Sequence, residues 1–276
     1  MLLRVLTALV GIPILVIAIW WGAPWLTALV VLVAVLSIRE FYRLLPQDAG
    51  PLPTALGVIW ITALVLGGQA ASGLNSFLLI SFTIWLAGAF FALLWLIAFY
   101  AGQRYLVAAI YLIVGPIYVG FLLAHSLVLR EVGGYDALGR SWLLFAVLVT
   151  FATDIGAFFV GRNLGRHPMA SQISPSKTWE GSGGGWLGAV VAAIILAQVL
   201  DLAMVGWKVV VIGATVGVLA QCGDLLGSKL KRISNVKDTG SIIPGHGGVL
   251  DRLDSIVISV PAVYYFVAMV FRPYGT

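Results

Sequence analysis

Residues of opposite charge are concentrated in one stretch near the end of the chain, KLKRISNVKDTGSIIPGHGGVLDRLDS, residues 229–255. The segments on both sides consist almost entirely of Leu, Val, Ala and Ile. The charged residues of the stretch are the cations Lys229, Lys231, Arg232, Lys237 and Arg252 and the carboxylates Asp238, Asp251 and Asp254. Cations and carboxylates mixed in this way are typical of sites where a metal ion meets phosphate groups.

Four aspartates lie at or near the expected membrane depth: Asp154, Asp224, Asp251 and Asp254. A carboxylate inside a bilayer costs about 2.5–3.5 kcal/mol even on lenient insertion scales, so such residues usually face a cavity or a partner. Each one taken alone is equally well explained as an acid near a helix end that reaches water or pairs with an Arg. Asp251 and Asp254 are expected to share one face of a helix and to lie in its first turn, where the dipole favours anions.

Asp224 is expected in the last turns of its helix, where the dipole disfavours a carboxylate and a compensating cation is needed. If the following loop folds back, Asp224 approaches Asp251, and a cation must join the two carboxylates. Ligands that are all oxygen favour a hard ion such as Mg²⁺, so Asp224, Asp251 and Asp254 are the candidate magnesium ligands. His246 is the only histidine near these acids, and no Cys₂His₂-type spacing supports a zinc site.

The basic residues of the same stretch suit a polyphosphate. Lys231, Arg232 and Lys237 can neutralise phosphate charge, and Arg252 lies between the last two aspartates. The PGHGG run, which includes His246, Gly247 and Gly248, offers backbone amides beside a helix N-terminus, an arrangement that binds anions. It is not a Walker A loop. A positive-inside loop that touches anionic lipid is the alternative, and it explains the cations but not the interleaved aspartates and glycines.

A second polar segment, residues 154–185, repeats this composition. Beside Asp154 it contains three cations, several glycines and several hydroxyls: Arg162, Arg166, Lys177, Ser174, Ser176 and Thr178. The run from Ser174 to Glu180 resembles a helix start. Ordinary capping and turn chemistry explains the hydroxyls and glycines, but not three cations beside a membrane aspartate. His125 and His167 are isolated, and both are interpreted as non-catalytic.

The composition requires that these polar segments be held by membrane helices. The chain has 276 residues, of which 61% are hydrophobic and only 10% charged, with a mean hydropathy of +1.05. Soluble domains carry about 25% charged residues, so this chain cannot cover a water-facing surface. The net charge of +5 is better explained by Lys and Arg in cytoplasmic loops than by nucleic-acid binding. The single Cys222 excludes an intrachain disulfide and is interpreted as a small buried hydrophobe.

The apolar runs predict an all-α polytopic membrane protein with about nine transmembrane helices. The first run is interpreted as a retained helix, because no small-residue cleavage site follows it. Pro116 and Pro261 fall inside runs and are expected to kink them. Residues 1–140 form the N-terminal transmembrane region and 141–276 the catalytic region of one membrane unit. The expected spans are about 4–21, 24–38, 53–69, 75–99, 105–129, 141–160, 183–200, 208–226 and 251–271.

The distribution of positive charge predicts the orientation. With the N-terminus inside, twelve of the 16 Lys and Arg fall on the cytoplasmic side, so the N-terminus is expected in the cytoplasm and the C-terminus outside. The loops 161–182 and 227–250 then face the cytoplasm together. The stretch 224–254 nearly cancels its own charge, so a polyphosphate there needs further cations. We therefore expect Asp154, Arg162 and Lys177 to line one cytoplasm-facing cavity with Asp224 and Asp251.

At the level of motifs, the chain resembles the phosphatidate cytidylyltransferases (CDP-diacylglycerol synthases). An S-x-x-K-R-x4-K-D pattern is met from Ser228 to Asp238, and G-H-G-G-x-x-D-R-x-D is met from Gly245 to Asp254. An upstream D-x-G-A…G-R-x-x-G-R…S-P-x-K-T-x-E-G pattern runs from Asp154 to Gly181. Ser176 departs from the Lys that many members carry. The specific resemblance covers about residues 150–256, whereas the first 140 residues match only as membrane helices.

The resemblance implies that CTP and phosphatidate give CDP-diacylglycerol and pyrophosphate with Mg²⁺, as a step of phospholipid biosynthesis. It also implies a homodimer in a bacterial inner membrane, with the active site facing the cytoplasm. The residues it marks as catalytic are Asp224, Asp251, Asp254, Lys231, Arg232, Lys237 and Asp238. Those it marks for substrate binding are Ser228, His246, Gly247, Gly248, Arg252, Arg162, Arg166, Ser174, Lys177, Thr178 and Asp154.

Two other functions fit parts of the sequence. A cation-coupled transporter also has intramembrane acids and kinked helices, but the charges here cluster at one face, and no inverted repeat is visible. A CDP-alcohol phosphotransferase is another Mg²⁺ enzyme of the membrane, but its D-G-x2-A-R-x8-G-x3-D-x3-D pattern is missing. Nothing in the sequence supports a noncatalytic scaffold.

Overall fold

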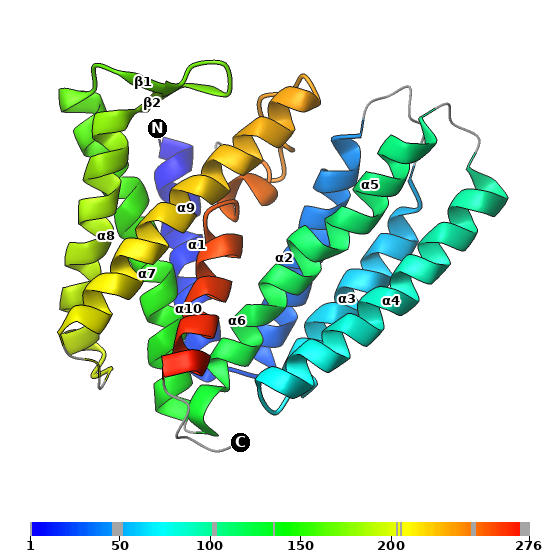
Figure 1. Cartoon of the computed structure of the whole chain (residues 1–276), viewed down its shortest axis with the longest axis horizontal. Coiled ribbons are helices and arrows are strands. Elements are labelled where there is room, and N and C mark those ends of the chain that lie inside the picture. The colour runs from blue at the N-terminus through cyan, green and yellow to red at the C-terminus, as the bar shows by residue number, and fades with distance from the viewer. Residues whose placement is uncertain are drawn as a thin grey trace. The chain divides into compact units, whose positions relative to one another are not determined.

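The computed structural model describes residues 2–45, 52–100, 104–134, 136–202, 204, 206–243 and 247–270. Within these residues the chain is almost entirely helical (Figure 1). The first half contains α1 (Leu2–Trp21), α2 (Trp25–Arg43), α3 (Thr54–Ala70), α4 (Leu74–Phe99), α5 (Tyr105–Gly115), the π-helical turn η2 (Pro116–Phe121), α6 (Leu122–Arg130) and the 3₁₀ turn η3 (Val132–Gly134). The second half contains α7 (Asp136–Leu164), β1 (Pro168–Ala170), β2 (Ser174–Thr178), α8 (Trp179–Val199), α9 (Trp207–Ile233), the 3₁₀ turn η4 (Leu250–Arg252) and α10 (Ile256–Val270).

The helical membrane class is confirmed. Among the described residues, six helices are long and apolar enough to cross a membrane, and shorter apolar helices cover Leu9–Trp21, Thr54–Ala70 and Ile256–Val270. One of the six, Tyr105–Arg130, runs through α5, η2 and α6. Within the described residues, every predicted span therefore coincides with a helix. How many of these helices cross the bilayer stays a prediction.

Pro116 interrupts the α-helical pattern within Tyr105–Arg130, whereas Pro261 lies inside α10. That the two prolines kink their helices stays a prediction. Pro116 opens the π-helical turn, because its ring nitrogen cannot donate the hydrogen bond that an α-helix requires at that position. Many large apolar side chains point outward from the helices; Leu79 and Ile97 on α4 are 68% and 70% exposed. In lipid such side chains need no protein partner, so outward apolar faces are the expected surface of a membrane protein.

Cys222 corrects one sequence-based interpretation. It was expected to be a small buried hydrophobe, but it is exposed on α9. The reason is that burial in protein gives a small apolar side chain little advantage when the alternative surroundings are lipid tails.

The described chain divides into two compact units, and we describe each by itself. Unit 1 comprises residues 1–128 and 233–252, and unit 2 comprises 129–232 and 253–276. In unit 1, α3 packs against α2 on one side and α4 on the other (Figure 1). Its core contains the fully buried side chains of Ile38, Ile61, Leu64, Phe77 and Leu112.

Unit 2 is built on close contact between α7 and α8. Glycines make this contact possible: a Cβ on Gly156 would lie 2.7 Å from the carbonyl oxygen of Gly184, and one on Gly185 would lie 2.9 Å from that of Thr153. The GxxxG pair Gly213 and Gly217 has a similar role between α9 and α8, where an added Cβ would meet the backbone of α8 within 3.3 Å. α10 packs on α7. The helices that present the polar residues of unit 2 are thus held backbone to backbone.

Two helix starts differ from the sequence prediction. The run Ser174–Thr178 was expected to begin a helix, but it forms a strand antiparallel to β1, and α8 starts only at Trp179. Thr178 provides the N-cap, because its hydroxyl accepts the Gly181 N–H at 3.1 Å. The last helix was expected to begin at 251 but begins at Ile256, after the η4 turn. Asp251 and Asp254 therefore do not share the face of one α-helix.

Candidate active site

An ion pair joins the two polar segments of unit 2. Lys177 Nζ, at the end of β2, lies 2.6 Å from Asp224 Oδ2 on α9, with the two side chains 25% and 35% exposed. Asp224 lies nine residues before the end of α9, in a helix apolar enough to cross a membrane, where a carboxylate needs a partner. The ammonium of Lys177 provides the compensating cation that this position requires.

Asp254 lies close to α9 beside the turn that carries Asp224, next to Gly223 and Gly227. A Cβ on Gly227 would lie 2.9 Å from Asp254 Cβ, so only glycine leaves room for the turn that carries this aspartate. The Asp254 carboxylate accepts the N–H of Ser255 at 2.8 Å. Burial, together with the nearby Asp224 carboxylate, raises the pKa of Asp254 to about 7, although the positive charge of Lys231 acts in the opposite direction. Asp224 and Asp254 are therefore close enough for their charges to repel.

Two more of the predicted residues act on this pair of carboxylates. Lys231, two turns after Asp224 on α9, supplies positive charge to Asp254, and Asp154 on α7 adds negative charge to the same group. Unit 2 thus brings Asp154, Lys177, Asp224, Lys231 and Asp254 into one electrostatic neighbourhood. These residues come from α7, β2, α9 and the turn before α10.

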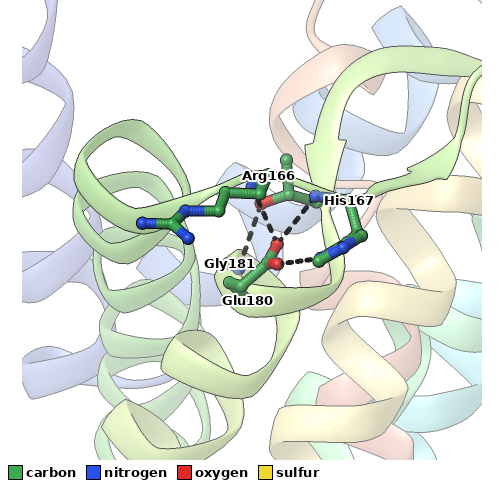
Figure 2. Close-up of polar contacts among 5 residues, drawn as sticks. Arg166, His167, Glu180 and Gly181 are labelled. Atoms are coloured by element: carbon green, nitrogen blue, oxygen red, sulfur yellow. Dashed lines mark hydrogen bonds and ion pairs between the residues drawn. The ribbon is translucent and has the colours of Figure 1, made fainter.

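The hairpin that carries Lys177 is fixed at its base by Glu180, in the first turn of α8 (Figure 2). One oxygen of Glu180, Oε2, accepts the main-chain N–H groups of Arg166 and His167 at 3.1 and 3.2 Å. The other, Oε1, lies 2.5 Å from His167 Nδ1. His167, which looked isolated in the sequence, therefore has a structural partner. Because the N–H of Trp179 also donates to the His167 carbonyl, both ends of the hairpin are held together.

The far end of the hairpin is held by α9. Arg232 donates from Nε to the carbonyl oxygen of Ile173, in the hairpin turn, at 3.2 Å. Arg162 lies with its guanidinium 6.0 Å from the centre of the Phe158 ring, one turn earlier on α7. Arg166 lies two residues before β1, and Ser174 is the first residue of β2. The hairpin between residues 168 and 178 therefore has anchors at its base and at its tip.

A half-buried amide side chain, that of Gln221, ties the helix turn before Asp224 to α8. Gln221, one turn before Asp224 on α9, donates to the carbonyl oxygens of Ser182 and Gly217 at 3.2 and 2.9 Å. Its Oε1 accepts the Ser182 hydroxyl at 2.5 Å. These bonds tie α9 to the first turns of α8, and so to the hairpin. Neither Glu180 nor Gln221 was singled out from the sequence, since each resembles an ordinary polar residue near a helix end.

In unit 1, Asp251 is held by its own loop. Its Oδ2 accepts the N–H groups of Thr239 and Gly248 at 2.9 Å and the hydroxyl of Thr239 at 3.0 Å. Gly247 has a φ of +87°, and a Cβ there would lie 3.0 Å from Asp251 Oδ2. Gly247 thus makes space for a carboxylate, and the Gly248 amide that was predicted to bind an anion donates to Asp251.

Glu40 on α2 is a buried carboxylate that the sequence analysis missed. It is 0% exposed and belongs to unit 1. Its Oε1 accepts the N–H of Val249 at 3.0 Å, and its Oε2 accepts the N–H of Leu250 at 2.8 Å. The same Oε2 lies 3.0 Å from the Thr239 hydroxyl, whose single hydrogen it shares with Asp251. Burying a carboxylate costs several kcal/mol, and bonds to a charged acceptor return about 1.5–3 kcal/mol each. Nothing in the sequence near Glu40 points to partners about 200 residues away.

The other predicted residues are distributed over the two units. Ser228 is half-buried on α9, while Lys237, Asp238 and Arg252 are exposed in unit 1. His246 lies outside the described residues. Within the described part of the chain, no three His, Cys, Asp or Glu side chains form a ready metal-binding group. Because Asp251 belongs to unit 1 and Asp224 and Asp254 to unit 2, the joint site predicted for the three aspartates stays a prediction.

The fold and these clusters define a class: a polytopic helical membrane protein with carboxylates and cations gathered at the ends of its helices. Within that class, the chain belongs to the cytidylyltransferase family, whose pattern it matches over residues 2–270. The family suggested by the sequence motifs is thereby confirmed, and the match extends through the N-terminal helices as well.

The chain is also similar to proteins named phosphatidate cytidylyltransferase. The protein from Bacillus subtilis (strain 168) is 38% identical over 159 residues, which cover 58% of this chain and 58% of the relative. The protein from Brucella suis biovar 1 is 39% identical over 159 residues, 58% of this chain and 57% of the relative. The alignments with these two relatives span less than two thirds of their length. The protein from Staphylococcus epidermidis (strain ATCC 12228) is 30% identical over 282 residues, 95% of this chain and 96% of the relative.

Proposed function

We propose that the chain is a phosphatidate cytidylyltransferase, which converts CTP and phosphatidate into CDP-diacylglycerol and pyrophosphate in phospholipid biosynthesis. The observation that carries the proposal is the contact of Lys177 with Asp224 beside Asp254, in a chain that belongs to the cytidylyltransferase family. There a cation of the hairpin, Lys177, contacts a carboxylate of α9, Asp224. Nucleotidyl transfer uses cations to bind phosphate groups and carboxylates to bind a metal ion. The choice of CTP and phosphatidate rests on the relatives and their motifs.

The carboxylates fit a magnesium ion. The ligand atoms would all be oxygens, which Mg²⁺ prefers. The carboxylates of Asp224 and Asp254 repel each other, and a cation, the ammonium of Lys177, already lies next to Asp224. Asp224 and Asp254, together with Asp251 of unit 1, are the residues that would hold the ion. When bound, Mg²⁺ would offset charge on the nucleotide phosphates and on the leaving pyrophosphate.

The chain's own residues then bind and orient the substrates. Lys177 and Lys231 hold phosphate oxygens by their charge, and Arg232 adds a guanidinium at the end of α9. Asp154 keeps the surrounding cations in place. The nucleophile, a phosphate oxygen of phosphatidate, is already an anion, so it attacks the α-phosphorus of CTP without a strong general base. The bond from that phosphorus to the bridging oxygen breaks, and pyrophosphate leaves.

We further propose that this site faces the cytoplasm in a bacterial inner membrane, with the N-terminus inside and the C-terminus outside. The excess of Lys and Arg on the proposed inner side supports this orientation. Phosphatidate reaches the cavity sideways from the cytoplasmic leaflet. A homodimer is the proposed assembly, on the basis of the family resemblance alone.

The test is an assay of the purified protein in detergent with CTP, phosphatidate and Mg²⁺. CDP-diacylglycerol and pyrophosphate are expected to form in equal amounts, and EDTA should stop both. Reactions with ATP in place of CTP, or diacylglycerol in place of phosphatidate, are the controls and should give no lipid nucleotide. If neither product forms from a folded preparation, the proposed function is wrong.

A further inference from the structure

The loop that holds Asp251 is itself organised by a residue far away in the sequence, Glu40 of α2. We propose that Glu40 is a positioning residue for the reaction, which fixes through Thr239 the orientation in which Asp251 binds a divalent cation. The inference rests on the proposed function for its chemical meaning. It concerns a helix of the N-terminal region, to which the motifs assign no functional residue.

The contacts to Asp251 converge on one of its oxygens, Oδ2, whereas Glu40 accepts hydrogen bonds on both of its oxygens. Glu40 Oε2 and Asp251 Oδ2 each lie 3.0 Å from the same Thr239 hydroxyl. The main-chain N–H of Thr239 also donates to Asp251 Oδ2 at 2.9 Å. These bonds to Oδ2 set the rotation of the Asp251 carboxylate and thereby the direction of its Oδ1. Thr239 thus lies between the two acids, so the position of the Glu40 carboxylate determines where Thr239, and through it the Asp251 carboxylate, is held.

The loop is shaped around the buried carboxylate. A Cβ on Gly240 would lie 2.6 Å from Glu40 Oε1, and one on Gly248 would lie 2.5 Å from Glu40 Oε2. The η4 turn begins where Val249 and Leu250 donate to Glu40, so this side chain caps the turn in which Asp251 lies. An apolar residue could fill the same space, but it could not hold these donors. The carboxylate therefore specifies the conformation of the loop that carries Asp251.

This arrangement is that of an outer-shell partner of a metal ligand. Such partners orient the ligand, and their loss typically lowers metal affinity or activity by about 10–100-fold. A residue that only fills the core would instead alter the amount of folded protein and leave metal affinity per folded molecule unchanged. Metal binding is therefore the measurement that separates positioning from packing.

The first experiment compares the parent with Glu40→Gln and with Glu131→Gln, an exposed glutamate as matched control. Purified protein in detergent is titrated with Mn²⁺, and bound ion is followed by electron paramagnetic resonance. Glu40→Gln is expected to bind Mn²⁺ about 10-fold more weakly and to need correspondingly more Mg²⁺ for half-maximal turnover. Glu131→Gln should match the parent in both. Parental Mn²⁺ affinity in folded Glu40→Gln would overturn the proposal.

A second pair of variants decides the matter if Glu40→Gln does not fold. Thr239→Val keeps the shape of the side chain but removes its hydroxyl, and it should weaken Mn²⁺ binding as Glu40→Gln does. Thr239→Ser restores the hydroxyl and should recover most of the affinity. Equal Mn²⁺ affinity of the Val and Ser variants contradicts the proposal, as does a parent that binds no Mn²⁺. If Mn²⁺ binding behaves as expected but no CDP-diacylglycerol forms, the proposed function fails and the positioning role stands.

Discussion

Asp224 is the residue on which the polar contacts of unit 2 converge. Lys177 neutralises it, Gln221 fixes the helix turn before it, and Asp254 lies close enough for repulsion. It also lies within α9, a helix apolar enough to cross a membrane, where a carboxylate is costly. A carboxylate kept in so unfavourable a place is expected to serve the reaction more than the fold.

Asp224→Asn should therefore lower kcat by about 100-fold or more, because it keeps the size of the side chain and removes the charge that binds cations. Thermal unfolding should change little, since the side chain is partly exposed. Asp201→Asn is the matched control: Asp201 is exposed in a turn with a φ of 49°, a conformation that Asn tolerates well. Near-parental turnover of Asp224→Asn at saturating Mg²⁺ would contradict the assignment.

At the scale of elements, the β1–β2 hairpin depends on α8 for its position. Glu180 accepts N–H groups from Arg166 and His167, so a single side chain closes the base of the hairpin that presents Lys177 (Figure 2). Charge-assisted bonds of this kind are stronger than neutral ones. The hairpin is thus expected to loosen as a unit when this carboxylate is removed.

Glu180→Ala should make the peptide bond after Arg166 more sensitive to trypsin and should lower activity by about 10-fold, as the loss of an outer-shell partner does. The reason is that two main-chain donors lose their acceptor and Lys177 is less firmly placed. The rate of cleavage at Arg166, followed by mass spectrometry, is the measurement, with Glu131→Gln as control. Parental cleavage together with parental activity would show that the hairpin is held by other contacts.

The glycine contact between α7 and α8 gives a second element-scale prediction. Gly185→Ala places a Cβ 2.9 Å from the Thr153 carbonyl oxygen, so it should destabilise the protein by about 1–3 kcal/mol. A Cβ on Gly183, also on α8, meets nothing within 4 Å, so Gly183→Ala should be neutral or stabilising by up to about 1 kcal/mol. Thermal unfolding in detergent compares the two. Equal midpoints would contradict the packing argument.

Apolar length made the helices predictable, whereas their ends depend on tertiary contacts. The strand before α8 could not be predicted, because Ser174–Thr178 contains good capping residues and its strand conformation depends on pairing with β1. The start of α10 moved from 251 to 256 because η4 is capped by Glu40 from α2. Lys177 was named because it lies in a motif, and Asp224 because it is an acid at the expected membrane depth. The contacts of Glu40, Glu180 and Gln221 could not be predicted, since they are made with residues brought near by folding.

At the scale of the whole molecule, the orientation in the membrane can be tested with single cysteines. The α8 helix separates the hairpin turn, at Ser171, from the turn that contains Asp201. If α8 crosses the bilayer and the hairpin faces the cytoplasm, these two positions lie on opposite sides. The native Cys222 is exposed, so the test begins from a Cys222→Ser background.

In intact cells, a membrane-impermeant maleimide should label Asp201→Cys and should label Ser171→Cys only after permeabilisation. This follows from the proposed N-in orientation, which places Arg162, Arg166 and Lys177 inside. Labelling yield on gels is the measurement, and labelling after detergent treatment confirms that both thiols react. The reverse pattern would place the hairpin outside and would exclude the cytoplasmic nucleotide pool as its substrate source.

The ammonium of Lys177 on Asp224 has a consequence for how the proposed enzyme rests between turnovers. A divalent ion at Asp224 would replace a charge already present, so loading is an exchange and adds one positive charge instead of two. The net affinity for the ion is then the free energy of the contact between metal and Asp224 minus that of the contact between Lys177 and Asp224. This affinity is weak as long as the displaced ammonium has no other anion to pair with. A nucleotide supplies that anion in its phosphates. By linkage, metal and nucleotide would each strengthen the binding of the other, and the idle enzyme would carry its own counterion in place of the metal.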